Sequence, residues 1–312
     1  MIEKETPAAP LLVLVGETAV GKTALSLTLA QKFNGEIISA DSRLFYKGMD
    51  IGTAKPTKAE QTQVPHYFID VCAPDETLTL GDYQAKAYAI INDIHRRGKL
   101  PLLVGGTGQY VMAVIEGWGI PAVSPQPALR AVLEAMPLAE LNRWLSVLDP
   151  EKYATIDRQN PRRVVRALEV TLVAGRPIST LQRKHPPGYD VALVGLTRSR
   201  ESLYARIDAR VDGMMAAGLL AELEGLRDAG YGRSLPSMSG LGYKQLWAYL
   251  AGEMSLAEAV ERIKFETHRY ARQQANWHKR LHGRIQWFNL DEPEAEQAVL
   301  AYVGRWLLAD SR

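Results

Sequence analysis

The 312-residue chain contains one cysteine, Cys72, and this scarcity excludes an internal disulfide and any cysteine-rich zinc site. It is typical of a reducing compartment. No apolar run approaches the roughly 20 residues that a bilayer-spanning helix needs. Residues 1–10 carry Glu3 and Glu5 and lack the apolar centre of a secretory signal. We therefore expect a cytoplasmic protein with no membrane partner.

The chain also lacks a strong net charge. Its formal charge is +2, so attraction to a polyanion has to come from local clusters of basic residues. Hydrophobic residues make up 46% of the chain, which is enough for a packed globular core. The length allows one large domain or a core with a smaller lobe.

Short apolar runs alternate with helical patterns, notably at Thr23–Phe33 and Leu80–Arg97. This alternation predicts an α/β fold with a mainly parallel sheet and helices on both faces. In such sheets, ligands bind beyond the carboxyl ends of the strands. The predicted strands are Leu11–Val15, Glu36–Ser39, Pro101–Val104, Val191–Leu196 and Ile285–Phe288.

The alternation stops between about residues 120 and 190, where proline-rich and helical stretches follow one another. We predict a helical insertion over residues 120–189, inside a core formed by residues 1–119 and 190–312. The helices expected in the insertion are Ala128–Ala135, Leu138–Leu148 and Arg162–Val173. After the insertion, a helix is expected over Glu201–Asp228. Its apolar stripe is interpreted as core rather than as a binding surface, and consists of Leu203, Ile207, Val211, Met214 and Leu219.

A phosphate-binding loop follows the first predicted strand and precedes a helix, as the motif G-x-x-x-x-G-K-[ST] requires. Backbone amides and the helix N-terminus would surround phosphate oxygens, so a P-loop NTPase-like fold is predicted. Lys22 is expected to bridge terminal phosphate oxygens, and Thr23 to bind Mg²⁺. The loop consists of Gly16, Glu17, Thr18, Ala19, Val20, Gly21, Lys22 and Thr23.

Two further features lie at strand ends. Asp41 follows the second predicted strand, where it could hold Mg²⁺ through water, act as a general base, or cap a turn. The third strand runs into Gly105–Gly108 rather than into a metal-directing aspartate, which disfavours ATP hydrolysis. Backbone and the Thr107 hydroxyl would then line the site.

Together these features resemble the bacterial type of the tRNA dimethylallyltransferase (tRNA isopentenyltransferase) family. The resemblance runs through most of the chain, and its ordered set of motifs is more specific than the phosphate loop alone. The segments that carry it are Ala40–Pro56, Pro65–Asp70, Leu103–Gly108, Arg163–Glu169, Leu203–Asp212 and Gly240–Lys244.

The resemblance implies transfer of a dimethylallyl group from dimethylallyl diphosphate to N6 of adenosine 37 in tRNA, with release of diphosphate. The phosphate loop would then bind the donor's diphosphate rather than ATP. Asp41 would remove the proton from the adenine amine. Arg210 would hold the leaving diphosphate together with Lys22, Thr23 and Mg²⁺, the expected cofactor. Thr107 would lie beside the flipped base, and contacts around that base are implied for Asp41, Ser42, Arg43 and Leu44.

The anticodon stem-loop of tRNA is the implied macromolecular partner, and basic residues gather in the insertion and near the C-terminus. Family motifs place tRNA contacts at Arg130, Arg162, Arg163, Val164, Val165 and Arg166. The C-terminal cluster comprises Arg262, Lys264, Arg269, Arg272, Lys279, Arg280 and Arg284, interleaved with Phe265, Tyr270, Trp277 and His278. His268 and Gln273 stand where the family usually has arginine. His278 and His282 are expected to be solvated or to face RNA rather than to bind zinc.

Three alternatives remain open at this point. An adenylate isopentenyltransferase would use the same donor but free AMP as acceptor. A P-loop kinase would bind ATP and use Asp41 as base toward a hydroxyl. A non-enzymatic RNA-binding protein would keep the loop as a relic. The helical insertion and the paired basic clusters favour tRNA over AMP, and a monomer is expected.

Overall fold

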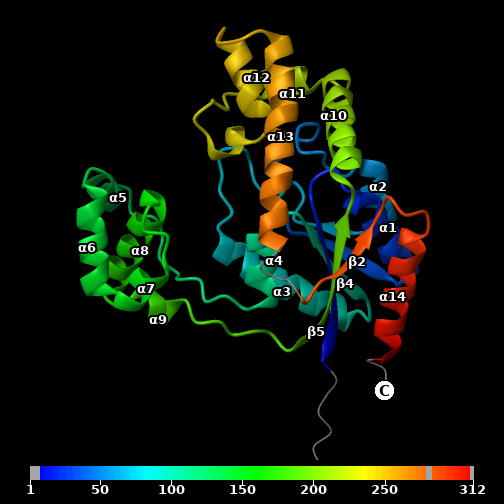
Figure 1. Cartoon of the computed structure of the whole chain (residues 1–312), viewed down its shortest axis with the longest axis horizontal. Coiled ribbons are helices and arrows are strands. Elements are labelled where there is room, and N and C mark those ends of the chain that lie inside the picture. The colour runs from blue at the N-terminus through cyan, green and yellow to red at the C-terminus, as the bar shows by residue number, and fades with distance from the viewer. Residues whose placement is uncertain (1–7, 279–282, 310–312) are drawn as a thin grey trace, which may run out of the picture. The chain divides into compact units, whose positions relative to one another are not determined.

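The computed structural model describes residues 8–278 and 283–309, which divide into two compact units (Figure 1). The sheet unit comprises Met1–Val111 and Gly188–Arg312, and the helical unit comprises Met112–Pro187. Lys279, Arg280 and His282, three of the basic residues singled out near the C-terminus, lie outside the described residues.

The described residues of the sheet unit form a six-stranded, wholly parallel sheet in the order β3-β2-β4-β1-β5-β6. All five predicted strands are confirmed, and β5 returns beside β1 after the helical unit. The additional strand, β3, is only two residues long, too short to leave an apolar pattern. The strands are β1 (Ala9–Gly16), β2 (Gly35–Ser39), β3 (His66–Tyr67), β4 (Leu100–Gly105), β5 (Tyr189–Thr197) and β6 (Gln286–Asn289).

Both faces of the sheet are buried, as expected for parallel strands. Leu12 and Leu14 pack in one core cluster with α1 (Lys22–Lys32) and α14 (Ala295–Ala309). Leu11 and Val13 point to the opposite face and are also fully buried. Figure 1 shows α3 (Leu80–Arg96) on the other side of the strands from α1 and α14. The predicted α/β sheet with flanking helices is therefore confirmed.

A group of helices lies above the carboxyl ends of the strands (Figure 1). It contains α10 (Arg200–Ala216), α11 (Leu219–Asp228), α12 (Tyr243–Leu250) and α13 (Leu256–His278), which share a core with Met49. The single helix predicted over Glu201–Asp228 is wrong. Gly218 adopts a left-handed conformation with φ 99°, which ends α10 and begins α11. The remaining elements of this unit are α2 (Lys58–Gln63), the short 3₁₀ helix η1 (Pro236–Ser239) and the start of α4 (Gly108–Ile115).

The helical unit has a core of its own, built from leucine and valine side chains of α5, α6 and α8. The helices predicted here are confirmed. Among the helices of this unit, α5, α7 and α8 begin with proline, whose missing N–H is not needed at the first helical position. The helices are α5 (Pro127–Glu134), α6 (Leu138–Leu148), α7 (Pro150–Thr155), α8 (Pro161–Ala174) and α9 (Ile178–Leu181).

Across residues 8–278 and 283–309, every helix is either too short or too polar to span a bilayer.

Candidate active site

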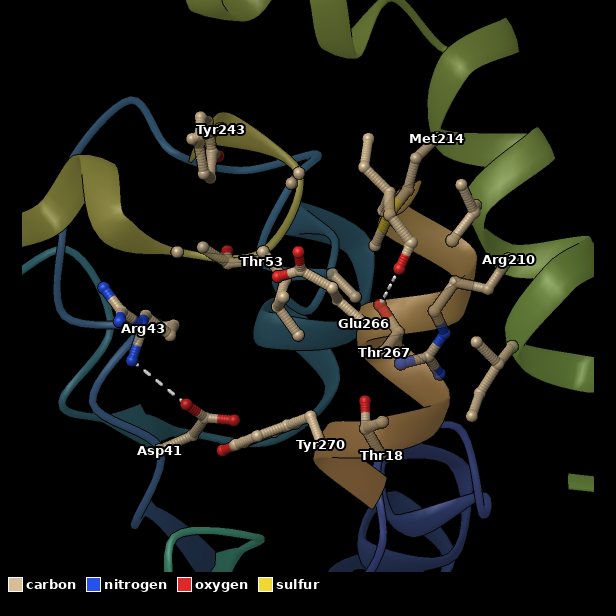
Figure 2. A pocket seen from close by; sticks show the side chains of 18 of the residues that line it. Thr18, Asp41, Arg43, Thr53, Arg210, Met214, Tyr243, Glu266, Thr267 and Tyr270 are labelled. Atoms are coloured by element: carbon tan, nitrogen blue, oxygen red, sulfur yellow. Dashed lines mark hydrogen bonds between the residues drawn. The ribbon is translucent and has the colours of Figure 1, made fainter. Parts of the chain in front are cut away.

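Three loops at the carboxyl edge of the sheet bring several predicted site residues together. The phosphate loop follows β1, Asp41 lies just beyond β2, and Thr107 lies just beyond β4. Since β1 and β2 both pair with β4, these loops are neighbours. They border a cavity of about 440 Å³ that is lined by Thr18, Asp41 and Thr107, and by Arg210 from α10 (Figure 2).

Two arginines hold the outer side of the phosphate loop. Arg198 Nε donates to the carbonyl of Val20 and Arg206 Nε to that of Ala19, each at 2.9 Å. Asp291 fixes Arg198 through an ion pair of 2.7 Å. Because the N–H of a peptide points away from its carbonyl, the bond to Val20 directs the Gly21 N–H to the opposite side, where it can face an anion. The Val20 N–H instead donates to the Glu17 carbonyl at 3.3 Å. Sequence reasoning missed both arginines, because neither belongs to the loop motif.

Lys22 lies folded back into the loop. Its Nζ donates to the carbonyl of Gly16 at 3.0 Å and to that of Glu17 at 2.8 Å. Burial lowers the pKa of Lys22 to about 8, and the negative charge of Asp41 only partly opposes this. Burial also raises the pKa of the Glu17 carboxyl, while its backbone hydrogen bond and the charge of Lys22 oppose this.

Arg210 adds a second cation, which has no anionic partner in the described part of the chain. Burial lowers its pKa, and repulsion from Arg206 lowers it further. Among the described residues, no carboxylate forms an ion pair with the guanidinium of Arg210 or with the ammonium of Lys22. Figure 2 shows the guanidinium directed from α10 toward Thr18. Desolvated cations without a counter-ion favour the binding of an anion from solution.

Asp41 is held in place by its own loop. Its Oδ1 accepts a hydrogen bond from the Arg43 backbone N–H at 3.0 Å, while its N–H donates to Ser39 Oγ at 3.2 Å. Figure 2 shows the carboxylate beside the Tyr270 hydroxyl. Burial, followed by the charge of Asp41, raises the pKa of Tyr270, whereas its interaction with Thr107 lowers it. Asp41 Oδ1 thus accepts the hydrogen bond of the turn, and the other carboxylate oxygen remains available to a substrate.

The residues after Asp41 divide between the cavity and its frame. Ser42 and Arg43 line the cavity, whereas Leu44 does not. The Arg43 guanidinium donates to the carbonyls of Pro236 and Ser237, at 3.3 and 3.2 Å. It therefore ties the Asp41 loop to η1 on the other side of the cavity.

A further wall of the cavity, Gly52–Ala54, depends on a carboxylate that the sequence did not single out. Glu222 on α11 accepts hydrogen bonds from the N–H groups of Asp50, Ile51 and Gly52, at 2.7, 2.7 and 3.1 Å. It also accepts one from the Tyr243 hydroxyl at 2.6 Å. A Cβ atom at Gly52 would lie only 2.5 Å from the Tyr243 ring, so glycine is required for this close approach.

The apolar stripe predicted here runs along α10 and into α11, and its interpretation as core is confirmed for most of its residues. Leu203 and Ile207 belong to the core cluster of the sheet, and Val211 and Leu219 to the cluster around Met49. Ile207, Val211 and Met214 also form an apolar side of the cavity. The pattern in the sequence is the same for core residues and for residues beside a cavity, since both positions need apolar side chains.

The two departures from the family pattern on α13 lie in different surroundings. His268 stacks on Tyr204, with ring centroids 4.1 Å apart, and its Nε2 lies 2.8 Å from Asp208 Oδ1. It therefore joins α13 to α10. Gln273 lines the cavity, as do Arg269 and Tyr270 on the same helix.

In the helical unit, the predicted tRNA contacts fall into three groups. Arg162 and Arg163 are exposed at the start of α8, whereas Val164 and Val165 are buried in the core of the unit. Arg162 borders a groove of about 810 Å³ at this end of the helix.

The third group consists of Arg130 and Arg166, both bound to Glu169, whose side chain is completely buried. Arg130 donates from Nε and Nη2 at 2.8 Å, and Arg166 from Nη1 at 2.5 Å. Burial by itself would raise the pKa of Glu169, but hydrogen bonds from Arg130, from the Gln126 backbone and from Arg166 outweigh it and hold the pKa at about 2. These two arginines therefore stabilise the helical unit from within.

A magnesium ion fits the oxygen atoms around the phosphate loop. Mg²⁺ usually takes one or two protein oxygens and completes its shell with phosphates and water. The Thr23 hydroxyl makes no hydrogen bond to another described residue, and the Asp41 carboxylate lines the cavity. In the described part of the chain there is no group of three histidine, cysteine, aspartate or glutamate side chains that could hold a metal by itself.

Comparison with protein families gives a match to the IPP transferase family over residues 44–281. A tRNA dimethylallyltransferase from Roseiflexus sp. (strain RS-1) is 49% identical over 302 residues, which is 96% of this chain and 99% of that protein. One from Herpetosiphon aurantiacus is 52% identical over 285 residues, 90% of each chain.

Two solved structures are also similar. The full-length tRNA isopentenylpyrophosphate transferase from Bacillus halodurans has a TM-score of 0.73 and 39% identity, and covers 97% of this chain and 98% of its own. A eukaryotic dimethylallyltransferase, crystallised while acting on tRNA, has a TM-score of 0.85 and 27% identity, with 97% of this chain and 80% of that chain covered.

Proposed function

Because the chain belongs to the family of tRNA dimethylallyltransferases, prenyltransferases that modify adenosine 37 of tRNA, we propose how its own residues perform the transfer. The donor is dimethylallyl diphosphate, the acceptor atom is N6 of the adenine, and diphosphate is released. The observation that carries this proposal is the cavity that Arg210, which forms no ion pair within the described residues, shares with Asp41 and Thr107.

The phosphate loop binds the diphosphate of the donor. Amides of the loop other than those of Thr18 and Val20, which donate within the protein, surround the phosphate oxygens together with the start of α1. Lys22 and Arg210 neutralise the charge of these oxygens. This charge grows on the leaving group as the carbon–oxygen bond breaks, so both cations stabilise the transition state more than the bound donor. Mg²⁺ supplies further positive charge when it is bound, and Thr23 together with Asp41, through water, would hold it.

Asp41 acts as the general base. The exocyclic amine of adenine is a poor nucleophile because its electron pair is delocalised into the ring, so it needs an oriented base at short range. As the nitrogen attacks the allylic carbon, its proton passes to the free oxygen of Asp41, and the bonding pair leaves with the diphosphate. Thr107 and Tyr270 orient the adenine beside Asp41. The apolar side formed by Ile207, Val211 and Met214 receives the dimethylallyl group.

The adenine has to leave the anticodon loop to reach this cavity, and unstacked loop bases are recognised by stacking and edge contacts. Ser42 and Arg43 contact the extruded nucleotide in the cavity, and Leu44 its surroundings. The helical unit (Met112–Pro187) corresponds to the insertion that the sequence predicts over residues 120–189. It binds RNA phosphates through Arg162 and Arg163. All groups proposed for the transfer come from one chain, so a monomer suffices.

Purified protein with dimethylallyl diphosphate, Mg²⁺ and an anticodon stem-loop tests the proposal. We expect the mass of one dimethylallyl group to be added at adenosine 37, and no addition when guanosine occupies that position. Faster transfer to AMP than to the stem-loop would favour the adenylate enzyme. Appearance of the γ-phosphate of ATP on an acceptor would favour a kinase.

A further inference from the structure

We infer that Gln274 is a positioning residue that ties the donor loop to the acceptor side of the cavity. This inference rests on the proposed function of the phosphate loop. Gln274 lies on α13 with only 4% of its surface exposed, so its amide group is desolvated. It belongs to neither the phosphate-loop motif nor the lining of the cavity.

The amide of Gln274 joins two loops that are far apart in the sequence. Its Oε1 accepts a hydrogen bond from the N–H of Thr18 in the phosphate loop at 2.8 Å. Its Nε2 donates to the carbonyl of Gly106, in the loop after β4, at 3.1 Å. An N–H can only donate and a carbonyl can only accept, so these partners allow one orientation of the amide.

The same side chain also reaches the acceptor side. The Tyr270 hydroxyl, one turn earlier on α13, interacts with both Thr107 and Gln274, and these interactions lower its pKa against the effect of burial. Tyr270 lies beside Asp41 in Figure 2. One buried amide therefore sets the distance between the loop that holds the leaving group and the residues that orient the amine. Catalysis by orientation is sensitive to such distances.

The close packing at Gly106 supports this role. A Cβ atom at this glycine would lie 2.3 Å from Gln274 Nε2, and its next nearest contacts would be at 3.3 Å. Position 106 therefore has room for the amide of Gln274 and for no side chain. Glycine is needed at position 106 because of the neighbouring Gln274 amide. Backbone conformation is not the reason, since Gly106 does not adopt a left-handed conformation.

The inference is tested with Gln274→Met, which keeps the length of the side chain but neither donates to Gly106 nor accepts from Thr18. Affinity for inorganic pyrophosphate in the presence of Mg²⁺ is measured by calorimetry, together with kcat and KM for prenyl transfer. We expect pyrophosphate binding to weaken about tenfold, as for the loss of a buried hydrogen-bond partner, and kcat/KM for the donor to fall at least as much. Stem-loop affinity should stay within about twofold. Asn276→Ala, at an exposed position of the same helix, is the matched control and should behave as wild type.

A double-mutant cycle separates positioning from packing. Gly106→Ala should weaken pyrophosphate binding about as much as Gln274→Ala, because the new methyl displaces the amide. Once Gln274→Ala has removed that amide, adding Gly106→Ala should cost less than about twofold. Additive losses, or pyrophosphate affinity that is unchanged in Gln274→Met, would overturn the inference. A wild-type protein that binds no pyrophosphate would instead contradict the proposed donor loop.

Discussion

Arg130 donates two hydrogen bonds of 2.8 Å to the carboxylate of Glu169, which is completely buried inside the helical unit. Family motifs predict Arg130 as a tRNA contact, yet the structure gives its guanidinium a partner within the protein. Arg166 shares that partner, whereas Arg162 makes no ion pair within the described residues. Basic residues of one predicted surface should therefore respond differently to substitution.

Arg130→Ala is expected to destabilise the helical unit. Removing one partner of a buried ion pair leaves the other charge only partly compensated, which costs about 3 kcal/mol. Urea denaturation should show this loss in the free energy of unfolding at neutral pH. The contribution of Glu169 is present above pH 4.5, the normal pKa of glutamate, and is lost as the pH falls toward its folded pKa of about 2. Unchanged unfolding, accompanied by weaker tRNA binding, would show that Arg130 serves the RNA alone.

Arg162→Ala is expected to weaken tRNA binding without lowering stability. The side chain is exposed at the start of α8, so its loss removes a charge and no ion pair with another described residue. For a phosphate contact, the dependence of log K on log salt should become shallower by about 1. Filter binding across a salt series measures this slope. An unaltered slope would remove Arg162 from the RNA surface.

Asp41→Asn is expected to abolish most prenyl transfer while preserving tRNA binding. The asparagine oxygen can still accept from the Arg43 N–H, so the loop should keep its conformation. The amide cannot take the proton, and kcat should fall by about 10²–10⁴-fold. Single-turnover kinetics at saturating tRNA, with stem-loop affinity measured in parallel, checks both expectations. A variant with normal kcat would refute the assignment of Asp41 as base.

The depressed pKa of Lys22 predicts a loss of donor binding at alkaline pH. As the pH rises through about 8, the free protein loses the ammonium charge. Pyrophosphate affinity and kcat/KM for the donor should then fall. Between this value and the normal pKa of 10.5, the unfolded chain binds the proton that the folded chain has lost, so this group makes folding more favourable as the pH rises. Lys22→Arg keeps its charge and should lack the alkaline decline. An identical profile in that variant would assign the decline to another group.

Glu222→Gln is expected to loosen the Gly52–Ala54 wall of the cavity. The amide offers one acceptor oxygen in place of two, so some of the N–H groups of residues 50–52 lose their partner. Each such loss in a partly buried site costs about 1–3 kcal/mol. We expect a lower melting temperature and an increased KM for tRNA. Glu224→Gln, on the same helix but outside this network, is the control. If the contacts of Glu222 with residues 50–52 had no role in function, KM for tRNA would stay at its wild-type value in Glu222→Gln.

Much of the fold could be predicted from the sequence, because its signals are local. Apolar runs gave five of the six strands of the described sheet, and helical periodicity gave α1, α3 and the main helices of the helical unit. The error at Gly218 has the same origin. A helical stripe continues across a glycine in the sequence, and the left-handed turn that splits α10 from α11 leaves no gap in that stripe.

The candidate site could be predicted in part. Its motif residues lie at strand ends, and the parallel sheet brings the ends of β1, β2 and β4 to one edge, so Thr18, Asp41 and Thr107 were expected to meet. Arg198, Arg206 and Glu222 were not expected. Each contacts backbone groups of a distant loop, and such a contact leaves no pattern of residue types near either partner.

The sequence by itself determined the alternation of strands and helices, the phosphate loop and the family, since each is written in neighbouring residues. Only the tertiary structure decided which charges are satisfied within the protein and which remain for a substrate. Arg130 and Arg210 are the same residue type, yet one binds a buried glutamate and the other faces a cavity. The bond from Thr18 to Gln274 spans 256 positions. Contacts of this kind depend on how the helices pack over the sheet, because packing brings together groups that the chain itself keeps far apart.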